Sequence, residues 1–401
     1  MGMAKQQQIM CDERKYGNDD SRVCKYCIGN KHLSQFVYEN GDKMKCSFCG
    51  KNANCITIED LSGEIMDAIA LEYVDANECM GWEGGEYIGA NTWDTYDLLN
   101  DLNDDMQLAD NVLESICNNI YDITWCETDP YSLRSHKEHH YMWQSFCEMV
   151  KHRTRYVFFR MPKKHNYYDE KSPFLILDHI AEAADKLGLF EKVKKGTHFY
   201  RGRTHEEPNF FSKPSCLSSP PNNRAKANRM SAEGISVFYG ADSEKTALSE
   251  ISTDTLCFAT VARFRSLRDL IVLDLTKIHK FSNPSLFDNE LGKYREQIAF
   301  IRSLEKDLTK PIKGELGIDA IQYVPAQVVA EYFRYLHKVQ GKSIDGIAYR
   351  SAEYNDGTCY ALFFNQKQCL FDPQCAKIQQ LEIVKRSYRK YKMTGSWEDY
   401  K

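Results

Sequence analysis

Apolar residues recur at helical spacing through much of the first half of the chain. The two clearest sets are Leu61, Ile65, Ile69 and Tyr73, and Leu108, Val112, Ile116 and Ile120. A period near four places such side chains on one face of a helix. A third helical stretch, rich in histidine and aromatic residues, extends from Ser132 to Val150. The region from about Thr57 to His152 is therefore predicted to be helical.

The pattern changes near Leu187. Ser172 and Pro173 are typical of a helix N-cap and first turn, and the helix that they begin should end at Gly188. Short apolar runs then alternate with brief helices, which is typical of an α+β domain. The runs are His198 to Tyr200, Ser236 to Tyr239, Leu256 to Val261, Leu270 to Leu275, Ile344 to Tyr349 and Cys359 to Phe364.

An irregular segment interrupts this second region between Thr204 and Asn228. It contains four of the eleven prolines of the chain. A loop of this length inside a compact domain is usually functional or disordered. It connects two of the candidate site residues described below.

Cysteine spacing is informative near the start of the chain. Cys24 and Cys27 form one C-x-x-C pair, and Cys46 and Cys49 form a second. Two such pairs supply four sulfurs, which suits a structural, tetrahedral zinc ion, and their separation resembles that of zinc ribbons. The alternative is four free cysteines in a small core. Cys11 and Cys55 flank the pairs and could compete as ligands.

These patterns predict three parts. They are a zinc-binding module over residues 1–56, a helical domain over residues 57–186, and an α+β domain with a C-terminal tail over residues 187–401. The candidate chemistry described below makes the third part the expected catalytic domain, and a regulatory role is then expected for the helical domain.

Composition indicates a soluble globular protein, with 42% hydrophobic and 27% charged residues. The net charge of -5 makes nucleic acid an unlikely general partner, and the basic residues of the tail are expected to be solvated. The sequence has no apolar stretch of about 18 residues, so no membrane span is predicted. Met1 to Met10 lacks the features of a secretory signal, so a cytoplasmic location is expected.

Three stretches of the C-terminal half carry the candidate chemistry. They are Phe199 to Arg203, Asn228 to Gly234 running on to Glu250, and Asp345 to Ser351. Together they resemble the RES family, named after an arginine, a glutamate and a serine, here Arg201, Glu250 and Ser351. A second arginine of the family matches Arg229, and Tyr239 follows it in order. The resemblance covers about Gly196 to Phe371. The N-terminal arrangement resembles the leader region, likened to HEPN domains, that precedes some RES domains.

The resemblance implies a fold related to ADP-ribosyltransferases, NAD+ as substrate and a role as a toxin or antiphage effector. Glu250 would stabilise the oxocarbenium-like transition state, as carboxylates do in glycoside hydrolysis. Arg201 and Arg229 would bind the pyrophosphate, and Tyr239 would stack on the nicotinamide or its ribose. Ser351 would position a phosphate or the nicotinamide amide. Arg203 should lie on the same strand face as Arg201, without an assigned role.

The main functional hypothesis is an NAD+ glycohydrolase or phosphorylase. The alternatives are a protein mono-ADP-ribosyltransferase and a zinc-dependent binding protein with an inactive RES domain. Arg160 and His165 have the R-x4-H spacing of HEPN ribonucleases, but Pro162 would disturb the helix of such a motif. An antitoxin, a trigger protein or a second copy of the chain is a possible partner of the N-terminal region.

Overall fold

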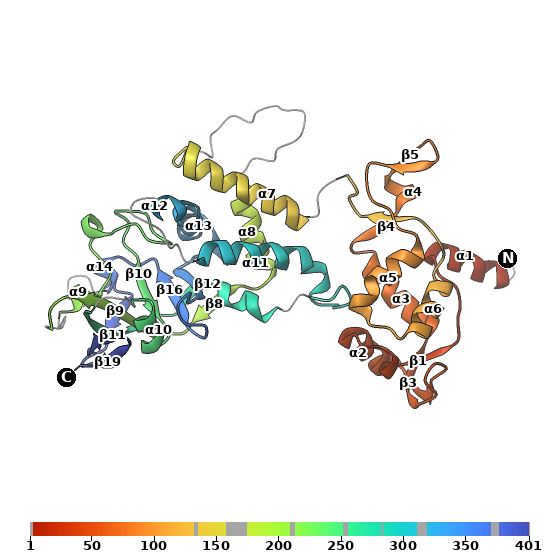
Figure 1. Cartoon of the computed structure of the whole chain (residues 1–401), viewed down its shortest axis with the longest axis horizontal. Coiled ribbons are helices and arrows are strands. Elements are labelled where there is room, and N and C mark those ends of the chain that lie inside the picture. Colours follow the sequence, from red (N-terminus) through yellow and green to blue (C-terminus); the bar gives the residue numbers. More distant parts are fainter. Residues whose placement is uncertain are drawn as a thin grey trace. The chain divides into compact units, whose positions relative to one another are not determined.

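The structure is a computed structural model, shown in Figure 1. It describes residues 3–131, 135–157, 175–208, 213–251, 256–281, 284–310, 319–369 and 377–400. The chain forms two compact units. The first combines Met1–Lys137 with Ser282–Gln297, and the second combines Glu138–Phe281 with Ile298–Lys401.

The first unit contains a small antiparallel sheet followed by helices. The sheet has the order β1-β3-β2, and α2 packs against β3. Its elements are β1 (Arg22–Cys24), η1 (Lys25–Cys27), α2 (Lys31–Asn40), β2 (Asp42–Lys45) and β3 (Asn52–Thr57), after α1 (Met3–Arg14). The main helices are α3 (Ile58–Ile69), α5 (Thr95–Met106) and α6 (Asp110–Asn119). Thr57 begins α3 with a capping box that it forms with Asp60.

Two of the predicted helical repeats end earlier than their apolar spacing suggests. The helix α3 ends at Ile69, and Tyr73 instead begins β4 (Tyr73–Asp75), which pairs with β7 (Trp125–Glu127). The helix α6 lies inside the second repeat, and Ile120 is its C-cap in extended conformation. The hairpin of β5 (Gly81–Glu83) and β6 (Glu86–Ile88) and the short α4 (Ala76–Cys79) follow β4.

Residues on both sides of the predicted boundary at 56/57 share one core. Leu33 and Val37 of α2 belong to the same buried cluster as Leu61 and Ile65 of α3. The first 56 residues therefore do not form a separate hydrophobic core. This differs from the predicted division, because a short two-knuckle module has too little apolar surface of its own.

A segment from the later half of the chain completes this core. Leu286 and Phe287 are buried in the same cluster. The Leu286 N–H donates to Asp105 Oδ2 over 2.8 Å, and Asn30 Nδ2 donates to Ser285 Oγ over 2.9 Å. His32 and Asp288 approach to 3.3 Å. We call residues 284–297 the strap.

The second unit is built on a sheet that has ten strands within the described part of the chain. The strand order is β19-β18-β11-β9-β10-β16-β15-β12-β8, with β17 also paired to β11. All these pairs are antiparallel except β12 with β15. The strands are β8 (Phe190–Val193), β9 (His198–His205), β10 (Phe238–Ala241), β11 (Phe258–Ser266), β12 (Leu270–Asp274), β15 (Gly346–Arg350), β16 (Thr358–Leu362), β17 (Leu381–Ile383), β18 (Arg389–Met393) and β19 (Trp397–Asp399).

Helices accompany this sheet. The short α10 packs on β9, β10 and β11, and α13 packs on β15 and α8. The helices are α7 (Ser135–Glu148), α8 (Leu175–Lys186), α9 (Pro214–Leu217), α10 (Glu244–Ser249), α11 (Arg295–Thr309), α12 (Asp319–Gln322), α13 (Val324–Tyr335) and α14 (Gln366–Cys369). A π-helical turn, Met149–Arg153, extends α7. The mixture of helices and a mainly antiparallel sheet confirms the predicted α+β class.

The last two helices before Leu187 lie in the second unit, α8 entirely and α7 from Glu138 on, which differs from the predicted boundary there. Trp143 of α7 donates to Asp307 Oδ2 of α11 over 2.9 Å, and Tyr332 of α13 donates to Asp178 of α8 over 2.6 Å. An amphipathic helix must bury its apolar face, and α11 and α13 provide that surface. Gly188, with φ of +60°, follows α8 as predicted.

All six apolar runs predicted in this region contain strand residues. The predicted loop from Thr204 to Asn228 begins in the last residues of β9 and includes α9 and the 3-10 turn Asn222–Arg224. Arg160, His165, Ser172 and Pro173 lie outside the described residues. Among the described helices, none has the length and apolarity needed to cross a membrane.

Candidate active site

Strand β9 supplies one wall of the candidate site. Arg201 lies opposite Ala262 of β11, and Arg203 lies opposite Thr260. Residues two apart on a strand share a face, so both arginines lie on the face of Phe199, which is fully buried. The Arg201 guanidinium carbon is 5.3 Å from the centre of the Phe238 ring.

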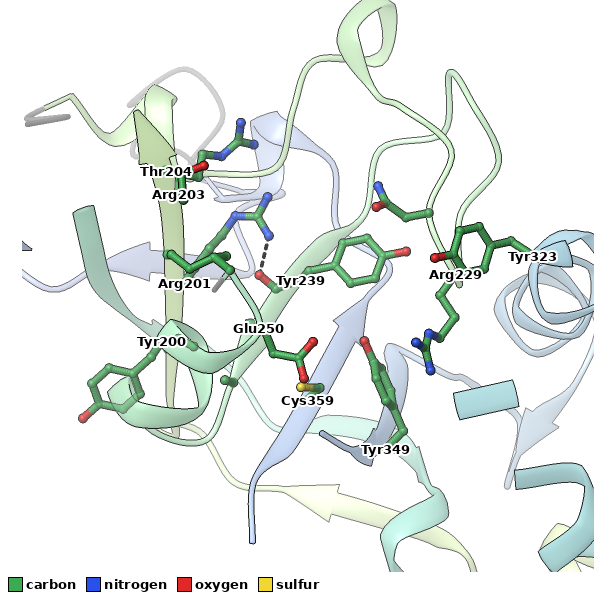
Figure 2. Close-up of a pocket in the computed structure, with 16 residues that line it drawn as sticks. Tyr200, Arg201, Arg203, Thr204, Arg229, Tyr239, Glu250, Tyr323, Tyr349 and Cys359 are labelled. Atoms are coloured by element: carbon green, nitrogen blue, oxygen red, sulfur yellow. Dashed lines mark hydrogen bonds between the residues drawn. The ribbon is translucent and has the colours of Figure 1, made fainter. Parts of the chain in front are cut away.

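The sheet separates between β9 and β10. Their ladder consists of one pair, Ala241 with Tyr200. Beyond that pair the Arg201 side chain bridges the two strands, because its Nη1 donates to the Tyr239 carbonyl (Figure 2). The arginine thus satisfies a backbone acceptor that a continued ladder would have used.

Arg229 lies in a tight turn on the other side of the site. Asn228 and Ser231 pair across this turn, and Gln327 Nε2 donates to both of their carbonyls. The Tyr239 hydroxyl accepts from the Met230 N–H over 3.1 Å and lies 3.0 Å from Ser231 Oγ. Tyr239 therefore fixes the turn that carries Arg229.

Glu250 is placed by the short helix α10. Ser243 caps the beginning of the helix, and Glu250 is its C-cap. A glycine at position 202 leaves room for α10 beside β9, since a Cβ there would lie 3.4 Å from the Ala247 carbonyl oxygen and 2.6 Å from Ile251 Cδ1, just after the helix. The helix end therefore brings the carboxylate to the face of the split strands.

Ser351 orients this carboxylate. It follows β15 and is buried, and its Oγ donates to Glu250 Oε1 over 2.5 Å. The same oxygen accepts from the backbone N–H groups of Glu353, at 3.2 Å, and Tyr354, at 3.0 Å. The serine hydrogen therefore points at Glu250, because the two N–H groups occupy the acceptor side of the hydroxyl.

Four of the five predicted residues line one cavity of about 550 Å³, and the fifth, Ser351, is bonded to one of the four. Figure 2 shows Arg201 and Glu250 on one side, Arg229 on the other and Tyr239 between them. The lining residues are Tyr200, Arg201, Gly202, Arg203, Thr204, Asn228, Arg229, Tyr239, Gly240, Ala241, Ala247, Glu250, Ile251, Tyr323, Tyr349 and Cys359. Three arginines and one carboxylate line this cavity, so it favours an anion.

Two of the arginines are poorly compensated. Burial lowers the pKa of Arg201, and the neighbouring Arg203 lowers it further. Burial also lowers the pKa of Arg203. The Nε atoms of both side chains have no hydrogen-bond partner among the described residues. A bound anion would offset the desolvation of both guanidinium groups.

Sequence reasoning missed Tyr349 and Cys359. The Tyr349 ring is buried, its hydroxyl faces the cavity (Figure 2), and Arg229 lies 5.9 Å above the ring centre. Burial first, and then the nearby Glu250, raise the pKa of the Cys359 thiol. Both residues occupy ordinary strand positions. In the sequence, the only signal for Tyr349 is that it lies two residues before Ser351, and Cys359 has no such signal.

The four predicted metal ligands also come together, in the first unit. The Sγ atoms of Cys24, Cys27, Cys46 and Cys49 all lie within 4.8 Å of one another, so the cluster could hold a metal ion. Cys55 is not part of it, and its Sγ lies 3.5 Å from the Met44 carbonyl and 3.3 Å from the Ala53 carbonyl. Cys11 likewise lies apart, beside Asn18.

Comparison with known families covers most of the chain. The model of HEPN/RES N-terminal domain 1 matches residues 39–164, and the model of the RES domain matches residues 200–383. The second match includes all five predicted site residues of the C-terminal half. No curated protein and no solved structure matches the chain. The chain therefore contains a RES domain, with a HEPN/RES N-terminal domain ahead of it.

Proposed function

We propose that the cavity binds NAD+ and cleaves the bond between nicotinamide and ribose. The observation that carries this proposal is one carboxylate, Glu250, oriented by Ser351 inside a cavity with three arginines. A RES domain is consistent with an enzyme that acts on NAD. The resemblance to RES enzymes further implies a relation to ADP-ribosyltransferases and a role as a toxin or antiphage effector.

The side chains of the cavity fit two parts of this substrate, the pyrophosphate and the nicotinamide. Each phosphate of NAD+ carries a negative charge, and Arg201 and Arg229 offer planar guanidinium groups that bind phosphate oxygens at two points. The aromatic faces of Tyr239 and Tyr349 suit the cationic nicotinamide ring. This binding would leave Glu250 to act on the ribose.

Cleavage passes through an oxocarbenium-like state on the ribose. The bond between the anomeric carbon and the nicotinamide nitrogen breaks, and its electron pair leaves with nicotinamide, which becomes neutral. The Glu250 carboxylate stabilises the positive charge that develops on the ribose, so its effect is larger in the transition state than in the ground state. Water, phosphate or a protein nucleophile then bonds to the anomeric carbon and loses a proton.

Release of nicotinamide from NAD+ by the purified chain tests the proposal. We expect Glu250→Gln to reduce the rate about a hundredfold or more, because it removes the charge and keeps the shape. Ser351→Ala should reduce kcat less, since the carboxylate remains. Glu398→Gln, which changes an exposed carboxylate of β19, is the matched control. Absence of nicotinamide release by the wild-type chain, with phosphate present, would contradict the proposal.

NAD+ labelled in its adenine separates the possible acceptors. Label that remains in small molecules supports hydrolysis or phosphorolysis, and label on protein supports mono-ADP-ribosylation. Expression of Glu250→Ala in cells addresses the binding-only alternative, because an inactive RES domain should tolerate that change without effect on toxicity.

For the cysteine cluster we propose structural zinc. Neighbouring Sγ atoms lie 3.4 Å apart for Cys24 and Cys49, and 3.8 Å apart for Cys27 and Cys46. A tetrahedral zinc thiolate site has sulfurs about 3.8 Å apart. All four positions are sulfur, which suits a closed structural site. We expect the purified chain to contain zinc, and Cys46→Ser to lose it together with thermal stability.

A further inference from the structure

Exposed tyrosines and lysines alternate on the surface of the cysteine module. Lys25 Nζ lies 4.3 Å from the centre of the Tyr38 ring and 5.4 Å from that of Tyr26, and Lys51 Nζ lies 5.3 Å from the Tyr26 centre. Tyr26 is 64% exposed and Tyr38 49% exposed. We call Lys51, Tyr26, Lys25 and Tyr38 the lysine–tyrosine row.

The cysteine cluster and the small sheet hold this row in place. Lys25 and Tyr26 form the turn between Cys24 and Cys27, and Lys51 follows the second pair of cysteines. Tyr38 lies on α2, and its carbonyl accepts from Asn54 Nδ2 of β3 over 2.7 Å. The row is therefore presented by a fixed scaffold.

The surroundings of the row are strongly basic. Residues 22–51 contain six basic residues against Glu39 and Asp42, a local net charge of +4 in a chain of net charge -5. Lys43 pairs with Asn54 across the sheet and shares its face, which places another cation near Tyr38. The whole of β2 is exposed.

Apart from the cation–π contacts within the row, no carboxylate among the described residues neutralises these cations. Among the described residues, Lys25, Lys43 and Lys51 form no ion pair with a carboxylate. Tyr26 and Tyr38, for their part, are 64% and 49% exposed. Exposed rings next to cations that form no ion pair with a carboxylate suit a ligand that has both anionic groups and flat rings.

We propose that the lysine–tyrosine row binds single-stranded nucleic acid. Unpaired bases stack on exposed aromatic faces, and lysines neutralise the neighbouring phosphates. Alternation of rings and cations matches the alternation of bases and phosphates along a single strand. Beside the row, the described part of this module has a small sheet and one short helix. Stacking on the tyrosine rings requires unpaired bases, so a single strand is the expected ligand.

This site gives the N-terminal unit a ligand of its own, separate from the NAD+ cavity. The proposal does not depend on the reaction at Glu250. It revises the expectation from net charge that nucleic acid is an unlikely partner, since the local charge is opposite in sign to that of the whole chain.

Fluorescence anisotropy with labelled oligothymidylate and oligouridylate tests the site on the full chain with its metal. We expect binding that weakens steeply with salt, and about a tenfold loss of affinity for Tyr26→Ala and for Tyr38→Ala. Tyr26→Phe should retain affinity, because the stacking face remains. Lys25→Gln should weaken binding and reduce the salt dependence.

Tyr335→Ala is the matched control. Tyr335 is also exposed, and the Arg334 guanidinium lies 5.1 Å over its ring, but it lies in the other unit. Unchanged metal content and melting temperature establish that each variant is folded. The proposal is overturned if the wild-type chain fails to bind either oligonucleotide at low salt, or if folded Tyr26→Ala and Tyr38→Ala bind as well as wild type. Binding to anionic vesicles or acidic peptides in place of oligonucleotides would also overturn it.

Discussion

Arg203 is the residue whose significance changes most between sequence and structure. It lines the Glu250 cavity and also a second cavity of about 920 Å³, which is lined mainly by residues between β9 and β10. Arg224 and Lys226 line the second cavity as well. In Figure 2 the Arg203 guanidinium points away from Glu250. If NAD+ is the substrate, its adenosine side would extend past Arg203 into this loop cavity.

We therefore expect Arg203→Ala to raise KM for NAD+ about tenfold with a smaller change in kcat, because the residue would bind the substrate away from the reacting bond. Steady-state kinetics of nicotinamide release measure both. Arg263→Ala is the control, since Arg263 also has a buried, unpaired Nε among the described residues but lies opposite Tyr200, on the other face of the sheet. A fall in kcat at constant KM would refute this assignment.

Site residues could be predicted from the sequence where they lie in a recognisable motif. Arg201, Arg229, Tyr239 and Glu250 lie in short motifs, and the structure gathers them around one cavity. The hydroxyl of Tyr239, however, is bonded to the Arg229 turn, a contact that no spacing predicts. Contacts of this kind depend on which strands become neighbours, and that is a property of the whole sheet.

At the scale of elements, the position of Glu250 depends on the contact between α10 and β9. A Cβ at position 202 would lie 2.6 Å from Ile251 Cδ1. Gly202→Ala should therefore push the Ile251 side chain aside and crowd the Ala247 carbonyl of α10, which would lie 3.4 Å from the new Cβ, so that stability falls by about 1 kcal/mol and kcat is reduced. Thermal melting and nicotinamide release check this expectation.

A second substitution tests whether the contact with Ile251 causes the effect of Gly202→Ala. Ile251→Val removes the Cδ1 atom that the new methyl group would meet, so Gly202→Ala with Ile251→Val should recover most of the stability and activity. If the double variant is as impaired as Gly202→Ala, the effect arises from the strand and the proposed contact is not its cause.

The apolar runs predicted the existence of the central strands but could not predict their order. Strands β9 and β11, whose ladder runs from His198 to His205 on β9, are separated in sequence by β10. Non-local pairing of this kind is decided by packing between whole elements, and periodicity reports only local burial. Tyr73 shows the same limit on a smaller scale, because its helical spacing gave way to a strand pairing with Glu127.

The whole molecule is divided in a way that the linear sequence conceals. The strap, residues 284–297, lies within the range matched by the RES domain yet belongs to the first unit. In the sequence Leu286 and Phe287 are only a short apolar pair between polar residues. Their burial depends on a core formed by residues more than 150 positions earlier, such as Leu33 and Leu113. The strap makes folding of the N-terminal unit dependent on the C-terminal half of the chain.

We expect Phe287→Ala to destabilise the first unit by about 3–5 kcal/mol, because it removes a fully buried ring from that core. Chemical denaturation should then show the first unit unfolding before the second, with the zinc that we propose for the cysteine cluster released in the early transition. Asn289→Ala is the matched control, since Asn289 lies on the same strap and its contact with Glu64, at 3.2 Å, is exposed. If Phe287→Ala and Asn289→Ala melt alike, the strap is a surface attachment and the N-terminal core is complete without it.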